Sequence, residues 1–189
     1  TDPEFATLLL QENVQASADS DYTVRTYIDG LSADTQYYYR FLGAQQSVSR
    51  TGRTRTAPAP GQARQVKLAF VSCQCYEQAF YGSYARMLED DRNAPEDERI
   101  QFVLHLGDFI YEYCWHKNED GSPLPRIMPP FPDGVETPKF RYATTLADYR
   151  HLYKIYLSDP HLQAARANWP FICTWDDHEV ANNYMGDVI

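Results

Sequence analysis

The sequence predicts a chain of two parts, a short all-β segment followed by an α/β domain with a mostly parallel sheet. Residues 1–56 contain alternating and aromatic-rich strand patterns separated by turn signals. Residues 57–66 (APAPGQARQV) are rich in proline, alanine and glycine, which is typical of a linker. Over residues 67–189, buried strand patterns alternate with helical ones, and this order favours a parallel sheet connected through helices.

Three strands are expected in the all-β segment. They are residues 21–29, where apolar and polar side chains alternate, residues 36–42 (QYYYRFL) and residues 50–56 (RTGRTRT). Three strands are too few to bury a core. We therefore expect this domain to be incomplete, as though the chain begins inside it. Residues 31–37 (LSADTQY) resemble the corner of a fibronectin type III domain, in which the tyrosine hydroxyl bonds back to the backbone. Tyr37 is therefore expected to be a packed corner residue, with carbohydrate stacking as the alternative for these tyrosines.

The second part predicts strands at residues 67–72, 99–106 and 170–175 and helices at residues 80–88, 146–157 and 160–168. The first strand is a continuous apolar run (KLAFVS), as expected of a strand covered on both faces. Residues 112–143 contain proline and glycine and are expected to form one long loop.

The overall composition excludes several classes of protein. The formal charge is 17 − 26 = −9, which argues against a nucleic-acid-binding surface. No apolar run approaches the length of a membrane span. Residues 1–5 do not form a signal peptide, although a mature exported protein has lost its own. Four cysteines are too few for a disulfide scaffold, and the pairing of Cys75, Cys114 and Cys173 is left open.

Ligand-type side chains follow all three predicted strands of the α/β domain. Cys73 follows the first strand, Asp108 and Tyr111 follow the second, and Asp176, Asp177 and His178 follow the third. In open α/β sheets, sites lie at the carboxyl ends of the strands. Each segment alone has an ordinary reading, as a turn, a helix N-cap, a buried thiol or a polar residue at a strand end. Their convergence on successive strand ends favours a shared metal site.

The ligand types indicate two unlike metals. Gly107 permits a sharp turn off the strand, so that the carboxylate of Asp108 can project into the crevice and bridge two cations. Tyr111 lies three residues later, and a phenol loses its proton near neutral pH only beside a strongly acidic metal such as ferric iron. The thiolate of Cys73 suits iron or zinc, whereas carboxylates suit calcium, magnesium or manganese.

Three segments together resemble the alkaline phosphatase D (PhoD-like) family of metallophosphoesterases. They are residues 69–74 (AFVSCQ), 103–112 (VLHLGDFIYE) and 174–184 (TWDDHEVANNY). Residues 146–150 (LADYR) and 156–160 (YLSDP) are also similar to that family, as is a fibronectin-like domain before a catalytic one. The resemblance implies the N-terminal half of an α/β metallophosphoesterase-like domain, preceded by a partial fibronectin type III-like domain.

The same resemblance implies a calcium-dependent phosphatase and phosphodiesterase, with ferric iron beside calcium, exported by the twin-arginine route to the periplasm, the cell surface or the medium. It implies that Cys73 and Tyr111 bind iron and that Asp108 bridges the metals. Asp176 and Asp177 fall in the third sequence block, with Asp177 at the ligand position. His178 takes the position of the histidine that contacts phosphate on the leaving-group side. The substrate is expected to be a phosphate monoester or diester.

Other readings stay open beside this one. The superfamily completes its site with blocks further along the chain, so we expect an internal fragment that holds half a site and hydrolyses little by itself. The Asp-Asp pair stands where the wider superfamily has Gly-Asn, and Cys75 stands where relatives carry another residue. One alternative is a secreted binding module with a degenerate catalytic half. Another is a zinc or manganese hydrolase acting on a different ester.

Overall fold

The computed structural model describes residues 1–78 and 80–186, which form three small sheets and three α-helices in the described part of the chain. The strands are β1 (Gln36–Tyr39), β2 (Gly52–Arg55), β3 (Leu68–Val71), β4 (Phe102–His105), β5 (Tyr113–Trp115), β6 (Val135–Glu136), β7 (Phe140–Tyr142) and β8 (Phe171–Cys173). The helices are α1 (Gly82–Asn93), α2 (Leu146–Leu157) and α3 (Pro160–Asn168), and short 3₁₀ turns cover Ala18–Ser20, Ala44–Gln46 and Glu96–Glu98.

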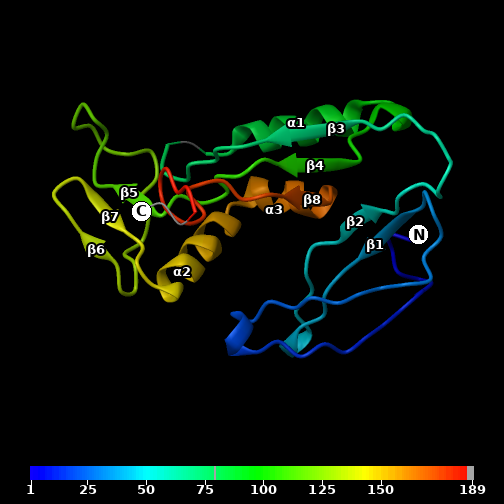
Figure 1. Ribbon diagram of the computed structural model, residues 1–189. Helices are drawn as coiled ribbons and strands as arrows, with labels where there is room; N and C mark the ends of the chain where they lie inside the picture. Colours follow the sequence, from blue (N-terminus) through cyan, green and yellow to red (C-terminus); the bar gives the residue numbers. More distant parts are fainter. Residues whose placement is uncertain (79, 187–189) are drawn as a thin grey trace.

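The central sheet has the order β3-β4-β8, and both strand pairs are parallel, as the sequence predicts. Its three strands run in one direction, toward the C-terminal segment, while β1 and β2 lie at the other end (Figure 1). Parallel strands place all of their carboxyl ends along one edge. The three segments with ligand-type residues therefore leave the sheet on the same side.

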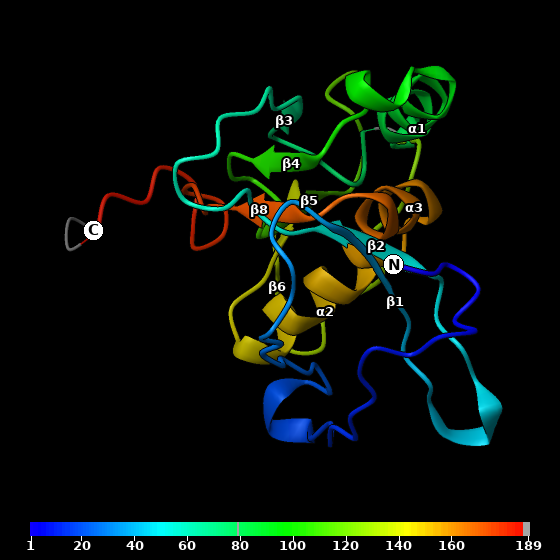
Figure 2. The same ribbon diagram turned by 90° about the vertical axis from the view of Figure 1, so that its right-hand side faces the viewer.

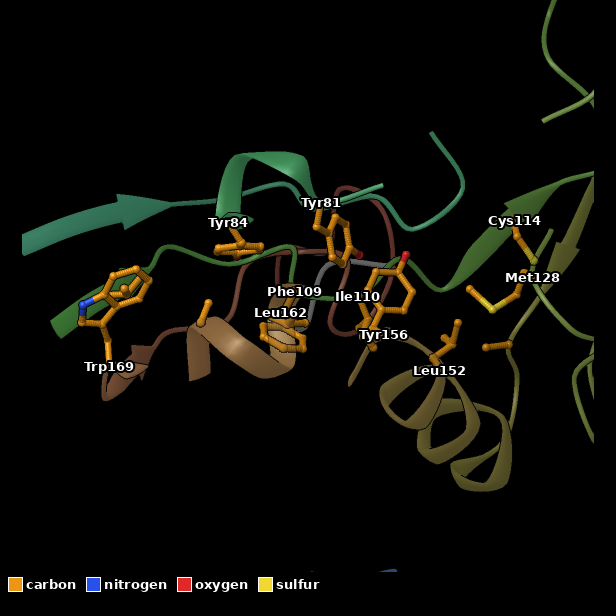
Figure 3. Close-up of a cluster of buried hydrophobic side chains, with 13 residues drawn as sticks. Tyr81, Tyr84, Phe109, Ile110, Cys114, Met128, Leu152, Tyr156, Leu162 and Trp169 are labelled. Carbon is orange, nitrogen blue, oxygen red and sulfur yellow. The ribbon is translucent and has the colours of Figure 1, made fainter. Parts of the chain in front are cut away.

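Helices α1 and α3 pack together on one side of this sheet (Figure 2). Between helices and strands lies a core of buried aromatic and aliphatic side chains (Figure 3), among them Tyr84, Val103, Leu162 and Trp169. The expectation that the first strand is covered on both faces is wrong for the described residues, because Phe70 is 71% exposed. Parallel sheets need cover on both faces, and the described helices supply it on one.

Two helices begin with side-chain caps that match their sequence. Thr145 accepts a hydrogen bond from the amide of Asp148 and the Asp148 carboxylate accepts one from the amide of Thr145, which forms a capping box at α2. Asp159 caps α3 before Pro160. Both helices have the predicted bounds. The helix predicted at 80–88 instead begins at Gly82 and continues to Asn93.

The N-terminal segment is a two-stranded hairpin of β1 and β2 rather than three strands. The strand predicted at residues 21–29 is wrong, since these residues are irregular and mostly exposed. Alternation alone does not hold a strand that has no partner to pair with. The hydroxyl of Tyr37 accepts a hydrogen bond from the amide of Ser32 at 2.8 Å, which is the backbone contact expected for the corner. Arg53 ties the hairpin to α1 through Asp91 at 3.0 Å.

Residues 112–143 are not one long loop, which corrects the sequence prediction. They contain an antiparallel sheet of order β5-β7-β6. Its strands are only two or three residues long, so no alternating pattern identifies them. Aromatic pairs stabilise it, including Trp115 on Phe140 at 4.4 Å between ring centroids. None of the helices in the described residues is long and apolar enough to cross a membrane.

Candidate metal centre

Three of the predicted site residues meet at the carboxyl edge of the central sheet. Asp108, Asp177 and His178 each bring a ligand atom within 4.8 Å of the others. Asp108 follows β4, and the other two follow β8, which pairs with β4. The parallel register therefore carries residues about seventy positions apart into one site. Asp108 and His178 are buried and Asp177 is half-buried.

The backbone turns sharply where the strands deliver these side chains. Cys73, Gly107 and Asp108 have φ values of +56°, +104° and +54°. Residues other than glycine in this left-handed region are strained, and such strain gathers at functional sites. Two hydrogen bonds tie the turns together, from the Cys73 amide to the Gly107 carbonyl at 3.2 Å and from the Gln74 amide to the Asp108 carbonyl at 3.1 Å.

Gly107 is required at its position for a second reason. A Cβ atom there would lie 2.4 Å from the Cβ of Asp176 and 2.7 Å from its backbone nitrogen. The two strand ends approach so closely only because residue 107 has no side chain. This close approach sets the spacing between Asp108 and the third segment.

Tyr111 and Cys73 border the cluster. The Tyr111 hydroxyl donates to Asp108 Oδ2 at 3.2 Å. Burial raises the pKa of Tyr111, and the neighbouring charge of Asp108 and the Cys73 side chain raise this pKa further. Without a cation the group is therefore a neutral phenol. The other oxygen of Asp108, Oδ1, is buried with no hydrogen-bond partner among the described residues. A carboxylate oxygen left bare in this way fits a bound cation.

Asp177 and His178 are each held by a specific partner. Asp177 accepts a hydrogen bond from the amide of Asn183, and this contact lowers the pKa of the Asp177 carboxyl. Nδ1 of His178 lies 2.7 Å from Glu112 Oε2, and the Tyr111 ring packs on the imidazole at 4.3 Å between centroids. With Nδ1 bonded to Glu112, Nε2 is the nitrogen left for a ligand or substrate.

Glu179 organises the site, although the sequence offered it only as part of the DDHE run. Its carboxylate accepts hydrogen bonds from the amides of Asp108 (3.1 Å), Phe109 (2.5 Å) and Asp176 (2.7 Å). One side chain thus fixes the backbone after both β4 and β8. Its position three residues after Asp176 is the spacing of a capping contact, and that spacing was the available signal.

The remaining predicted residues lie at the margin. Neither Cys73 nor Asp176 belongs to the three-residue cluster, and both are exposed. Asp176 contributes its backbone to the close contact with Gly107. Burial raises the pKa of the Cys75 thiol, and all four cysteines are free. His105 is a fully buried core residue, and burial lowers its pKa to about 4, so the ring is neutral.

The chemistry of the donor set fits a metal centre. Two carboxylates and an imidazole converge, with a phenol and a thiol beside them and one carboxylate oxygen that has no partner in the described part of the chain. The site therefore offers both hard oxygen ligands and softer nitrogen and sulfur ligands. An α/β sheet with such a cluster at its carboxyl edge defines the class, an α/β domain with a candidate metal site.

Comparison with known proteins gives the family. Residues 68–188 match the family model described as PhoD-like phosphatase, and residues 1–58 match PhoD-like phosphatase, N-terminal domain. The chain belongs to the PhoD-like phosphatase family. It is 37% identical over 188 residues to alkaline phosphatase D of Bacillus subtilis (strain 168), covering 99% of this chain and 29% of that protein.

A solved structure titled "Structure of PhoD" has the same fold as this chain. The TM-score is 0.76 with 35% sequence identity, over 97% of this chain and 32% of that chain. The chain therefore spans about a third of the length of the relatives it matches. The resemblance inferred from the sequence motifs is confirmed.

Proposed function

We propose that this chain forms part of the active site of a metal-dependent phosphoric ester hydrolase, an alkaline phosphatase and phosphodiesterase of the PhoD-like type. One observation carries the proposal: Asp108, Asp177 and His178 converge within 4.8 Å at the carboxyl edge of the sheet, with Asp108 Oδ1 buried and without a partner in the described residues. Family membership supports the reaction class.

Five side chains are proposed as metal ligands. Cys73 and Tyr111 would bind ferric iron, because a thiolate and a phenolate suit that ion better than they suit calcium. Asp108 would bridge iron to calcium, and Asp176 and Asp177 would serve the second position. Zinc or manganese are the less favoured occupants. When bound, such a pair of cations supplies an activated water and neutralises charge on the phosphoryl oxygens.

The protein's own residues then orient the ligands and donate a proton to the leaving group. Nδ1 of His178 lies 2.7 Å from Glu112 Oε2, so Nε2 is the nitrogen proposed to contact the substrate. A protonated ring would be balanced by the same carboxylate and would donate to the leaving oxygen. Glu179 keeps Asp108 and Asp176 in register through backbone contacts. The net charge of −9 repels an anionic substrate at a distance, so local cations must reverse the field.

The domain arrangement is part of the proposal, and the matches of residues 1–58 and 68–188 to two family models support a division near residue 60. Residues 1–56 would be a partial fibronectin type III-like domain, residues 57–66 a linker, and residues 67–189 the N-terminal part of the catalytic domain. The substrate would be a phosphate mono- or diester, and the intact protein would be exported. Because the chain spans about a third of the length of the relatives it matches, the 189-residue chain alone is expected to bind metal weakly and hydrolyse little.

The test is a leaving-group series in the intact protein. Replacing His178→Asn should lower kcat about 10²–10⁴-fold for alkyl phosphodiesters, with a smaller loss for nitrophenyl esters, whose leaving group needs no proton. His116→Asn, an exposed histidine in a loop, is the matched control and should leave both rates unchanged. If kcat falls equally for both leaving groups, His178 does not act as the general acid.

Elemental analysis tests the ligand set separately. Asp108→Ala should abolish binding of two metals, and Asp177→Asn should lower the content of at least one. Full activity with unchanged metal content in Asp108→Ala would overturn the bridging assignment.

A further inference from the structure

A second concave site lies at the opposite end of the central sheet from the metal centre. It is a pocket of about 230 Å³ between the β1–β2 hairpin and the amino ends of β4 and β8, where Gln101 and Pro170 precede those strands. The chain emerges from the pocket end of β4 at Gln101 and reaches the metal centre at Asp108. The four residues of β4 alone separate the two by about 13 Å.

The pocket has a small excess of positive charge. Its wall contains Arg53, Arg55, Arg64 and Arg99, against one acidic residue, Glu96. Two further carboxylates behind the wall pair with these arginines. Asp91 lies 3.0 Å from Arg53, and Asp34 pairs with both Arg55 and Arg64. The four arginines therefore outnumber the three carboxylates, although the formal charge of the whole chain is −9.

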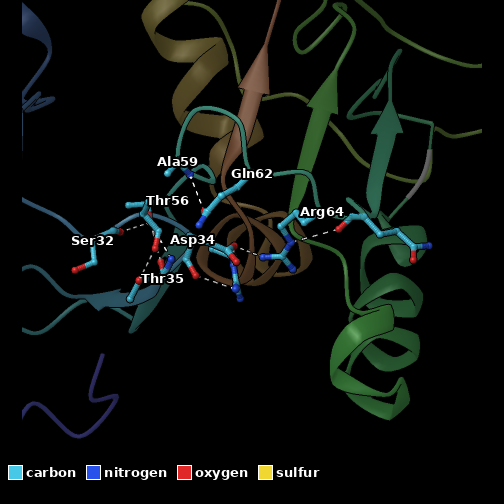
Figure 4. Close-up of polar contacts among 10 residues, drawn as sticks. Ser32, Asp34, Thr35, Thr56, Ala59, Gln62 and Arg64 are labelled. Atoms are coloured by element: carbon cyan, nitrogen blue, oxygen red, sulfur yellow. Dashed lines mark hydrogen bonds and ion pairs between the residues drawn. The ribbon is translucent and has the colours of Figure 1, made fainter.

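The arginines retain most of their hydrogen-bonding capacity. Figure 4 shows the Arg64 side chain directed at Asp34, with a second bond to a backbone carbonyl. Within the described residues, Arg53 and Arg55 likewise use two donor atoms each. Among the residues that the structure describes, Arg99 uses only Nε, which donates to the carbonyl of Ala94 at 3.3 Å. A guanidinium carries five N–H donors in a planar fork that matches an oxyanion.

We propose that this pocket binds a phosphate-class oxyanion, at a site separate from the metal centre. A concave site with excess positive charge and unused guanidinium donors is favourable for a tetrahedral dianion such as orthophosphate. Arg99 and Arg64 provide most of the recognition. Arg53 holds the hairpin against the C-terminal end of α3, and Arg55 bonds Asp34 beside β1, so both shape the pocket. The occupant is a free phosphate or the terminal phosphate of a monoester.

The test is calorimetric titration of the intact protein with inorganic orthophosphate. We expect one phosphate to bind at this pocket with a dissociation constant of about 1 mM or tighter. Arg99→Gln should weaken this binding at least about tenfold, since a charge-assisted contact is lost. Arg99 has no carboxylate partner among the described residues, so its replacement breaks no ion pair. Arg64→Gln, which leaves Arg55 on Asp34, should act in the same direction.

Two controls separate this site from the metal centre. Arg92→Gln removes an exposed arginine outside the pocket and should leave phosphate binding unchanged. Asp108→Asn should also leave the pocket's binding event intact, whether or not the protein proves to be a hydrolase. Phosphate binding that is lost in Asp108→Asn and unaffected by Arg99→Gln would overturn the second site, as would an absence of binding outside the metal centre.

A second titration tests whether the pocket recognises a terminal phosphate rather than a diester. Orthophosphate and glycerol phosphate, which are dianionic monoester-type ligands, should compete for the pocket. Dimethyl phosphate, which carries one charge and is blocked on two oxygens, should bind more weakly by at least about tenfold. Raising the ionic strength should weaken all three, because the site is partly open to solvent. Equal binding of the diester would contradict recognition by paired guanidinium forks.

Discussion

Replacing Glu179→Gln should damage the metal centre, although the change is nearly isosteric and Glu179 is not among the proposed ligands. The two carboxylate oxygens accept three amide hydrogens, with Oε2 taking those of Asp108 and Asp176 and Oε1 taking that of Phe109. A glutamine has one acceptor oxygen and one NH₂ group. Whichever way it turns, at least one of these amides faces a donor.

The size of the effect follows from the number of amides that lose an acceptor. An unsatisfied buried donor costs about 1–3 kcal/mol, so Glu179→Gln should lower the free energy of unfolding by about 2 kcal/mol. Glu179→Ala removes all three contacts, and we expect about 4 kcal/mol after allowing for partial exposure of the site. Misplacement of the backbone that carries Asp108 should also weaken metal affinity about 10–100-fold.

Urea unfolding and metal titration of the intact protein measure the two effects. Glu119→Gln makes the same chemical change at an exposed loop position and should stay within about 0.5 kcal/mol of the wild type. The expected order of stability is wild type, Glu179→Gln, then Glu179→Ala. If Glu179→Gln matches the wild type in both assays, the amide contacts do not hold the site together.

Three further changes test other parts of the structure. Gly107→Ala should destabilise the fold by more than about 1–2 kcal/mol, since φ is +104° and the new Cβ meets Asp176, and urea unfolding measures the loss. Burial raises the pKa of the Glu77 carboxyl to about 7 from 4.5, so ionising it penalises the folded state. The wild type should lose about 3 kcal/mol of stability between pH 4.5 and pH 7, and Glu77→Gln should flatten that slope in unfolding curves. Arg53→Ala leaves buried Asp91 without its cation and should cost about 2–4 kcal/mol, with faster amide exchange in β2.

Gly107→Ala has a matched control, and the other two changes each have an outcome that would contradict them. Gly82→Ala is the control for Gly107, because nothing lies within 4 Å of its Cβ position and it begins α1; it should be neutral or stabilising. The raised pKa of Glu77 fixes the direction in which stability changes with pH. The stabilising contribution of the protonated carboxyl is complete below pH 4.5 and lost above pH 7. A wild-type stability that rises over this range would contradict the assignment. Retention of β2 protection in Arg53→Ala would show that the ion pair does not anchor the hairpin.

The elements that the sequence predicted best are those whose signals are local. Helices α2 and α3 have the expected bounds because Thr145, Asp148 and Asp159 mark their starts through contacts with neighbouring residues. The strands β3, β4 and β8 were predicted from apolar runs, although Phe70 of β3 is exposed in the structure. Where pairing decides the outcome, local patterns failed. Residues 21–29 alternate but find no strand partner in the described chain, and β5, β6 and β7 are too short to show a period.

The sequence by itself determined which chemical groups follow each strand, and therefore which side chains were candidates for a metal site. Only the tertiary structure decided which of them meet, because the parallel register of β4 and β8 sets Asp108 beside Asp177 and His178, while Cys73 and Asp176 stay outside the three-residue cluster. The contacts from Glu112 to His178 and from Glu179 to the Asp108 amide could not be assigned from the sequence either. These partners lie about seventy residues apart, and contacts over that distance exist only once the sheet has formed.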